Sequence, residues 1–332
     1  MSNLPNTPSA PSPDACPNTW YAVAFSADLK PGKILPVTLA GQDLILWRTK
    51  DGIPHAHSAY CPHLGAHLGY GGAVRDDQLV CSFHKFTYNS EGICTKTSHG
   101  APPHKGRLAP KPVIETNNLI FVWHDNSGAP PDWTPPIFDS SIYRAHSTWQ
   151  QESTGHPLDN AENPIDWIHL PVTHNAPVPT LNKPLLFDGP NYVLDMSIKN
   201  FWYNFTAECI LTVSGPGIVV AQLVIPQTRI SALEIFSWTP TSGNQMTSRK
   251  VTYATFLGDG IPRIPIVVEK ALAAIVGYGS VRNIRRDLKI FTTRRYPKHA
   301  HLTSGEEDLA ACRRWEKQFF ESRQPDPVLR DS

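Results

Sequence analysis

The sequence has no excess of charge of either sign. Its 332 residues include 30 Lys and Arg against 29 Asp and Glu, without a lysine-rich block. A protein without a basic surface has little to attract nucleic acid or an anionic membrane. We therefore expect a small-molecule substrate and no nucleic-acid partner.

Long hydrophobic runs are also absent. The most apolar stretch, PIVVEKALAAIVGYG, starts at Pro265 and contains Glu269 and Lys270. It is about 15 residues long, whereas a membrane-spanning helix needs about 20. The stretch therefore predicts no membrane span. We expect an amphipathic helix at 264–280 that covers the entrance of a pocket, with contact to a membrane surface as the alternative.

The six cysteines follow no regular spacing, and no signal peptide precedes them. This pattern predicts metal-bound or free thiols in a reducing compartment, which makes the cytoplasm the expected location. Residues 1–17 are rich in Pro, Ser and Asn without an apolar period, so they predict a disordered tail. A second tail is expected at 323–332.

Two domains are expected between these tails. Residues 18–130 give short strands and turns, which predict a small antiparallel β domain: TWYAVAFS, KILPVTLAG, DLILWR, LVCSFH and NNLIFVW. Residues 131–148 form a polar, proline-rich connector. Residues 149–322 give longer strands: YVLDMSI, FTAECILTV, GIVVAQLVIP, RISALEIFSW and SRKVTYATFL. Helical patterns follow at about 264–295 and 304–322, so we expect an α+β fold.

Two pairs of cysteine and histidine occur in the first domain, Cys61-x-His63 and Cys81-x2-His84. A structural zinc site accepts both ligand types, but zinc fingers usually group their cysteines and their histidines separately. A Rieske [2Fe-2S] cluster binds one iron through two cysteines and the other through two histidines. The alternating order favours this cluster, with zinc as the alternative. Tyr88 is a candidate hydrogen-bond donor to a cysteine sulfur, or a half-buried strand residue.

The second domain contains the stretch ENPIDWIHLPVTH, in which Asp166, His169 and His174 have the spacing D-x2-H-x4-H. Asn163 and the proline after it predict a helix over 163–169, with Asp166 and His169 on one face. In a continuous helix His174 would point away from His169, since each residue turns the helix by about 100°. We expect Pro171 to break the helix between the two histidines.

Two histidines and a carboxylate form the facial triad of mononuclear non-haem iron oxygenases, which leaves metal positions open for O2 and water. Asp287 is the only acid between Glu269 and Glu306, so it is the candidate third ligand. Its neighbours Arg285, Arg286 and Lys289 offer an alternative, in which Asp287 forms ion pairs on a solvated helix surface.

The chain resembles the oxygenase (α) subunits of Rieske non-haem iron oxygenases from about Trp20 to Phe320. The resemblance rests on CPHLGAHL and CSFH for the cluster and on ENPIDWIHLPVTH for the mononuclear iron. The late stretch EEDLAACRRWEKQFF, together with Leu64 in CPHLGA, resembles the subgroup of 3-ketosteroid 9α-hydroxylase and the sterol desaturases. Lys85 and Phe86 depart from the Gly-Trp that the family often has, which puts a charge near the expected docking surface.

This resemblance implies an N-terminal Rieske domain and a C-terminal helix-grip (START-like) catalytic domain. Each subunit would hold one [2Fe-2S] cluster and one mononuclear Fe(II). The cluster ligands would be Cys61, His63, Cys81 and His84, and the iron ligands His169, His174 and Asp287. Asn163 belongs to the family's site pattern. Asp166 would carry electrons between subunits by accepting hydrogen bonds from His169 and from His84 of a neighbour.

The implied activity is the O2-dependent monooxygenation of a hydrophobic ring compound, by hydroxylation, desaturation or demethylation, with a steroid- or terpenoid-like substrate favoured. Electrons would come from NAD(P)H through a separate flavin reductase, with or without a ferredoxin. A head-to-tail homotrimer is also implied. The alternatives are N-oxygenation of an aryl amine, as in aminopyrrolnitrin oxygenase, and a Rieske electron-transfer protein with an inactive second domain.

Aromatic residues are dense among the strands of the second domain. They either line an apolar substrate cavity or form ordinary sheet core, which is the more common role of such residues. The residues concerned are Phe201, Trp202, Tyr203, Phe205, Phe236 and Trp238.

Overall fold

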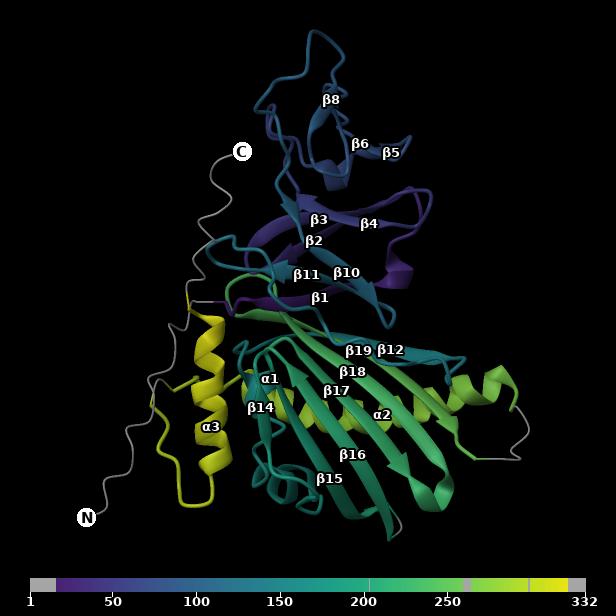
Figure 1. The fold of residues 1–332 in the computed structure, drawn as a ribbon, viewed down its shortest axis with the longest axis vertical. Helices are drawn as coiled ribbons and strands as arrows, with labels where there is room; N and C mark the ends of the chain where they lie inside the picture. The colour runs from purple at the N-terminus through teal and green to yellow at the C-terminus, as the bar shows by residue number, and fades with distance from the viewer. Residues whose placement is uncertain (1–15, 203, 259–263, 298, 322–332) are drawn as a thin grey trace.

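The computed structural model describes residues 16–202, 204–258, 264–297 and 299–321. The tail predicted at 323–332 lies outside the described residues, as do Tyr203 and nearly all of the tail predicted at 1–17. Figure 1 shows small sheets at one end of the long axis and a large sheet with the helices at the other. This arrangement confirms the expected α+β fold. The domain boundaries at 130 and 149 stay predictions.

The N-terminal part consists of three antiparallel sheets. The first contains β1 (Thr19–Phe25), β11 (Leu119–His124) and β10 (Val113–Thr116); the second contains β2 (Ile34–Leu39), β3 (Gln42–Arg48), β4 (Pro54–Ser58) and β9 (Pro110–Lys111); the third contains β5 (Ala73–Arg75), β6 (Gln78–Val80), β7 (Thr87–Tyr88) and β8 (Cys94–Lys96). The strand expected across LVCSFH ends at Val80, and the residues from Cys81 to His84 form a turn.

The C-terminal part is built on an eight-stranded antiparallel sheet. Its order is β12 (His146–Thr154), β19 (Gln245–Phe256), β18 (Ile230–Pro240), β17 (Ile218–Ile225), β16 (Phe205–Ser214), β15 (Asn191–Trp202) and β13 (Thr180–Leu181), with β14 (Leu186–Asp188) also paired to β15. The five strands expected between 192 and 257 are all present. Strand β12 was not predicted, because its sequence HSTWQQEST is polar and only pairing with β19 orders it.

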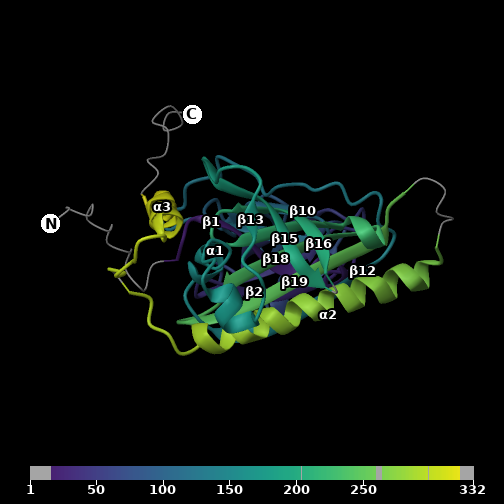
Figure 2. The ribbon, with the colours of Figure 1, turned by 90° about the horizontal axis from the view of Figure 1, so that it is seen from below.

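The helices are α1 (Asp159–Glu162), α2 (Ile266–Phe291) and α3 (Glu307–Trp315). Helix α2 runs along β12 and β19, as Figure 2 shows. Gly277 permits this close packing, because a Cβ atom there would lie 3.0 Å from Oγ of Ser147 and 3.1 Å from Oγ1 of Thr252. No helix in the described part of the chain is long and apolar enough to cross a bilayer.

The helix predicted over 163–169 was wrong. Helix α1 lies earlier and ends at Glu162, turns follow, and a single π-helical turn covers Leu170–His174. Pro164 explains the early end, because it has no N–H group and its ring would clash with the carbonyl of Asn160. Asn163 is therefore the residue that closes α1 at its C-terminal end, rather than the cap that begins a helix.

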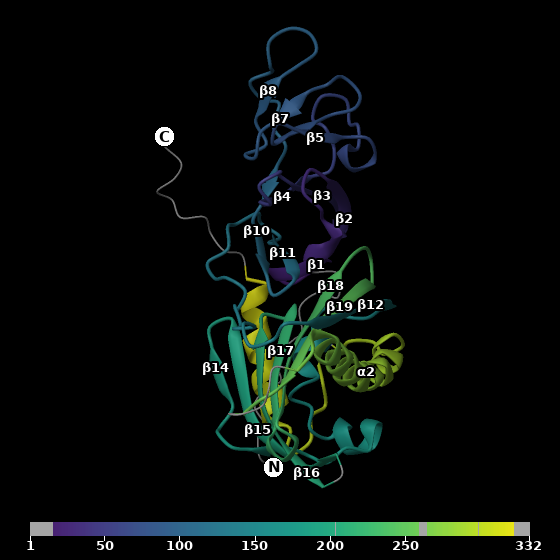
Figure 3. The same cartoon turned by 90° about the vertical axis from the view of Figure 1, so that its right-hand side faces the viewer.

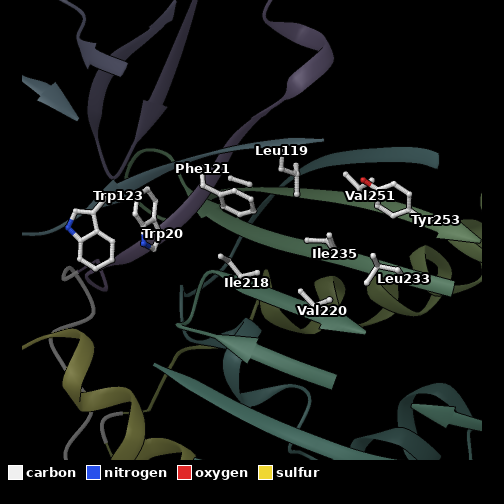
Figure 4. Packing of buried hydrophobic residues seen from close by; sticks show 11 residues of the cluster. Trp20, Leu119, Phe121, Trp123, Ile218, Val220, Leu233, Ile235, Val251 and Tyr253 are labelled. Carbon is white, nitrogen blue, oxygen red and sulfur yellow. The ribbon is translucent and has the colours of Figure 1, made fainter. Parts of the chain in front are cut away.

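A hydrophobic core joins the two parts of the molecule. Trp20, Phe121 and Trp123 of the first sheet pack against residues of the large sheet such as Ile218 and Ile235, as Figure 4 shows. Successive residues of a strand point to opposite faces. The large sheet therefore uses one face for this core and presents its other face, called here the inner face, to α2. Figure 3 shows the two faces edge-on.

Candidate metal centres

The two loops that carry the cysteine and histidine pairs have the same backbone hydrogen bonds. The bonds are Cys61 N to Ala66 O (2.9 Å) and Gly65 N to Cys61 O (2.9 Å) in the first loop, and Cys81 N to Phe86 O (2.8 Å) and Lys85 N to Cys81 O (3.1 Å) in the second. The equivalent fifth residues, Gly65 and Lys85, both have positive φ, at 73° and 56°. The two loops therefore present their cysteines in equivalent ways, although the histidines differ by one position.

The side chains of these loops converge. Cys61 and Cys81 are 2% and 1% exposed, and the rings of His63 and His84 lie 4.7 Å apart. The Nδ1 atom of His84 is buried and has no hydrogen-bond partner among the described residues. An unpaired buried nitrogen costs about 1–3 kcal/mol, so a metal bond at this atom would remove a penalty. Two thiols and two imidazoles at one place fit a Rieske cluster.

Tyr88 is fully buried rather than half-buried, and its role as a hydrogen-bond donor to a cysteine stays a prediction. It lies buried in strand β7, and its hydroxyl is 3.0 Å from Sγ of Cys61. Two other residues lie beside the cluster histidines and have no metal-ligand spacing in the sequence: Phe86, where the family often has Trp, and His99. Phe86 stacks on His63 with centroids 4.3 Å apart, and the ring of His99 lies 6.4 Å from those of His63 and His84. His99 has no metal-ligand spacing in the sequence, because it belongs to a separate loop that folds back toward the cluster histidines.

His169, His174 and Asp287 meet in the C-terminal part. One ligand atom of each lies within 4.8 Å of the others, and Nε2 of His174 is 2.8 Å from Oδ1 of Asp287. The π-helical turn explains how two histidines five positions apart reach one site. The N–H of Asn175 bonds to the carbonyl of Leu170, an i to i+5 bond. Such a wide turn places residues five apart on the same side. The helix was expected to break at Pro171, and it instead widens there into a π-helical turn.

Asp287 is 6% exposed, so the structure does not support the alternative of ion pairs on a solvated surface. Burial raises the pKa of Asp287 to about 6, opposed by His169 and by the amide of Asn163. Burial also lowers the pKa of His174. A bound cation would favour the carboxylate form of Asp287 and the neutral imidazole, so this donor set fits a divalent iron.

Asn163 and Asp166 flank this site in different ways. Asn163 donates from Nδ2 to Oδ2 of Asp287 at 3.2 Å. The carboxylate of Asp166 is 41% exposed, and its Oδ2 lies 3.8 Å from Nδ1 of His169, beyond hydrogen-bond distance. The same Nδ1 atom instead contacts the backbone carbonyl of Asp166. The Asp166 carboxylate is thus left accessible to solvent.

A buried charge cluster lies behind the metal-binding segment and was not foreseen from the sequence. Glu162 accepts hydrogen bonds from Tyr296 at 2.6 Å and from Arg313 of α3 at 2.7 Å. Arg294 pairs with Asp159 and Glu162. The cluster ties α3 to α1, immediately before Asn163. It therefore helps to fix the segment that carries the two histidines.

Among the aromatic residues proposed to line a cavity, Trp238 is 2% exposed and packs with Met246, Leu288 and Phe291. Trp238 therefore belongs to the sheet core, which was the alternative to a cavity-lining role. Phe236 and Phe205 are half-buried. The side chains of Phe201 and Trp202 and all of Tyr203 lie outside the described residues.

Comparison with known families assigns both parts of the chain. Residues 19–112 match the Rieske [2Fe-2S] domain, and residues 122–320 match the 3-ketosteroid 9alpha-hydroxylase C-terminal domain. The first match decides between the two metals considered for the four loop residues, because it favours the iron–sulfur cluster over zinc.

Two curated relatives are sterol enzymes by name. The chain is 36% identical to cholesterol 7-desaturase nvd of Bombyx mori over 168 residues, which cover 49% of this chain and 37% of that protein. It is 26% identical to cholesterol 7-desaturase nvd of Xenopus laevis over 346 residues, which cover 94% and 74% of the two chains. The chain thus spans little more than a third of the Bombyx protein.

Solved structures share the fold at low identity. Dicamba monooxygenase bound to dicamba is 18% identical with a TM-score of 0.65, covering 91% of this chain and 96% of that one. NdmA of Pseudomonas putida CBB5 with caffeine is 16% identical with a TM-score of 0.70, covering 90% and 89%. Because the two family matches together cover residues 19–112 and 122–320, the chain belongs to the Rieske non-haem iron oxygenases, a family of oxidoreductases, and its C-terminal domain is of the 3-ketosteroid 9alpha-hydroxylase type.

Proposed function

We propose that the protein is the terminal oxygenase of a multicomponent Rieske system, which uses O2 and electrons from a reductase to monooxygenate a hydrophobic ring substrate. The grouping of His169, His174 and Asp287 carries this proposal. Two histidines and one carboxylate leave metal positions free for O2 and water. The same grouping argues against an electron-transfer protein with an inactive second domain.

The residues of the chain have separate roles in this mechanism. Cys61, His63, Cys81 and His84 would hold the [2Fe-2S] cluster, and His169, His174 and Asp287 would hold the iron. The bound iron would supply O2 activation and the cluster would supply electrons. Tyr88 would donate its hydroxyl proton to the sulfur of Cys61 and so tune the reduction potential. Asn163 would hold the Asp287 carboxylate in position.

The proposed substrate is apolar, because the inner face of the large sheet is incompletely covered. Ile218, Val220 and Ile235, on the face toward the N-terminal sheets, are fully buried. Their inward-pointing neighbours are only half-buried: Val219, Ala221, Leu223 and Phe236. Half-covered apolar side chains beside a metal centre are typical of a site for an apolar ligand. The matched family and relatives favour a steroid- or terpenoid-like ring system over an aryl amine.

Electrons would pass between subunits. Figures 1 and 3 show the hairpins β5 to β8 and the segment after α1 at opposite ends of the molecule. We propose a head-to-tail homotrimer, in which His84 of one subunit donates a hydrogen bond to Asp166 of the next. Exposed apolar residues support this pairing on both sides, Leu64 and Phe83 near the cluster and Ile168 and Val172 near the iron site.

A separate flavin reductase oxidising NAD(P)H, with or without a ferredoxin, would supply the electrons. This partner and a cytoplasmic location both stay predictions. So does a gating role for the N-terminal half of α2, whose outer side exposes Val267, Ile275 and Tyr278.

A single-turnover experiment tests the proposed function without the natural reductase. The iron-loaded protein is reduced chemically, mixed with a set of steroids under ¹⁸O2, and the products are analysed by mass spectrometry. We expect oxidised product, carrying ¹⁸O where the reaction is a hydroxylation. His169→Ala should give none while keeping the visible spectrum of the cluster, and Cys61→Ser should lose that spectrum. Product formation by His169→Ala would refute the assigned iron site.

A further inference from the structure

An ion pair lies under α2 on the inner face of the large sheet. Nζ of Lys250 on β19 is 2.5 Å from Oε1 of Glu234 on β18. The same oxygen accepts hydrogen bonds from Ser280 of α2 at 2.8 Å and from Thr252 at 3.1 Å. Lys250 also contacts Ser280 and the carbonyl of Gly277. This polar group joins two strands to the helix that carries Asp287.

Apolar residues lie beside this polar cluster on the inner face. The neighbours of Glu234 on the inner face include Ala221, directly opposite on β17, and Phe236, two positions along β18. The Lys250 side chain is 2% exposed. Burying two charges costs several kcal/mol per ion, and apolar residues of similar size are often as stable or more stable. Packing alone therefore does not account for the pair, and a binding role would.

One acceptor atom of the pair remains open. Within the described part of the chain, all three donors to Glu234 bind Oε1, and none binds Oε2. The Glu234 side chain keeps 17% of its surface accessible, whereas that of Lys250 keeps 2%, so the glutamate is the member of the pair that a ligand can reach. A carboxylate oxygen accepts hydrogen bonds and cannot donate them. The open atom therefore fits a hydroxyl group of a ligand and does not fit a ketone oxygen.

The position of this atom relative to the metal ligands is set by α2. Ser280, which touches Glu234, precedes Asp287 by seven residues, so the two lie on the same helix face about 10 Å apart along the axis. Of the half-buried apolar residues on this side of α2, Ile284 lies between Ser280 and Asp287, whereas Leu272 and Val276 precede Ser280. A ligand held at Glu234 would therefore pass Ile284 on α2 before it reached the iron site.

We propose that Glu234 binds the hydroxyl group of an elongated apolar alcohol, such as a hydroxysterol, and thereby sets which carbon faces the iron site. Glu234 is a specificity-determining residue in this proposal, and Lys250, Ser280 and Thr252 hold its carboxylate in place. The inference rests on the proposed function, since it needs an apolar ligand on the inner face. It adds that the ligand is an alcohol and not a ketone.

Binding of two sterols that differ only at one group tests this directly. The probes are 5α-cholestan-3β-ol and 5α-cholestan-3-one, partitioned between the full-length metal-loaded protein and a cyclodextrin by equilibrium dialysis. The variant is Glu234→Gln with Lys250→Met, which removes both charges together so that no buried charge is left unpaired. Glu208→Gln, the same change on an exposed part of β16, is the matched control, and circular dichroism checks that each variant folds.

We expect the wild-type protein and the control to bind the alcohol at least tenfold more tightly than the ketone, because a hydrogen bond to a charged group contributes about 1.5–3 kcal/mol. The double variant should bind both within about twofold. Equal binding of both probes by the wild type, or a preference that survives in the double variant, would overturn the inference and leave the proposed function standing. Failure of the wild type to bind either sterol would overturn the inference and the steroid-like substrate class, and the single-turnover experiment would then decide the oxygenase function separately.

Discussion

Nε2 of His174 lies 2.8 Å from Oδ1 of Asp287, which joins the π-helical turn to α2. The second carboxylate oxygen of Asp287 accepts a hydrogen bond from Asn163. The Asp287 carboxylate is thus fixed from two sides by residues of one short segment. A metal centre assembled in this way should be sensitive to Asn163 although Asn163 contributes no metal bond.

Asn163→Leu removes the hydrogen bond to Asp287 at similar side-chain volume. We expect the dissociation constant of Co²⁺ at the mononuclear site to rise about 10- to 100-fold, as is usual when a partner of a metal ligand is lost. Equilibrium dialysis with metal analysis measures this with the cluster intact. Asn283→Leu, an exposed position on α2, serves as the control. Unchanged Co²⁺ affinity in Asn163→Leu would show that Asn163 does not hold the ligand.

Tyr88→Phe removes the hydroxyl that lies 3.0 Å from the sulfur of Cys61. The hydrogen bond stabilises the reduced, more negative cluster, so its loss should lower the reduction potential. A differential of about 1 kcal/mol corresponds to about 40 mV for one electron. Protein-film voltammetry measures the potential. Tyr60→Phe is the control because Tyr60 bonds to Asp43 instead. A potential that moves equally in both variants would contradict the assignment.

Lys85 occupies a backbone position that suits glycine, with φ of 56°. Lys85→Gly should therefore raise the stability by about 1 kcal/mol and the thermal midpoint by about 1–2 °C. Lys85→Ala separates this effect from the loss of charge, because alanine keeps the Cβ atom and should gain nothing from the backbone. Differential scanning calorimetry of both variants is the measurement, and an equal gain in Lys85→Ala would point to charge as the cause.

His57 should make the free energy of unfolding fall in mild acid. It is 1% exposed, and its Nδ1 accepts a hydrogen bond from the indole of Trp47 at 3.1 Å. Burial, with a smaller effect of His55, lowers the pKa of His57 from 6.5 to about 4. Between pH 6.5 and about pH 4, His57 takes up a proton in the unfolded chain but not in the folded one. The contribution of His57 to stability is therefore fully present above pH 6.5 and is lost as the pH falls toward 4.

The loss attributable to His57 should be about 2 kcal/mol between pH 6.5 and pH 5. Chemical unfolding at the two pH values measures it. His57→Gln keeps an acceptor for Trp47 and should lose correspondingly less stability over this range, whereas the exposed control His104→Gln should behave like the wild type. Identical pH dependence in all three proteins would exclude His57 as the source.

The features predictable from the sequence are those that are local. Dense β-branched residues predicted β15 to β19, and the spacing of Cys61, His63, Cys81 and His84 predicted their convergence. Strand β12 was missed because its order comes from pairing with β19. The role of Asp287 stayed open because its burial depends on how α2 packs. The Glu234–Lys250 pair could not be foreseen, since it depends on the register between two strands.

Iron and acid-labile sulfide per chain, measured on protein purified without oxygen, test the central claim most directly. One [2Fe-2S] cluster and one mononuclear iron predict about three irons and two sulfides, with a Rieske signal in the electron paramagnetic resonance spectrum on reduction. Two irons and two sulfides that persist after iron reconstitution would contradict the mononuclear site. Zinc without sulfide would contradict the account as a whole.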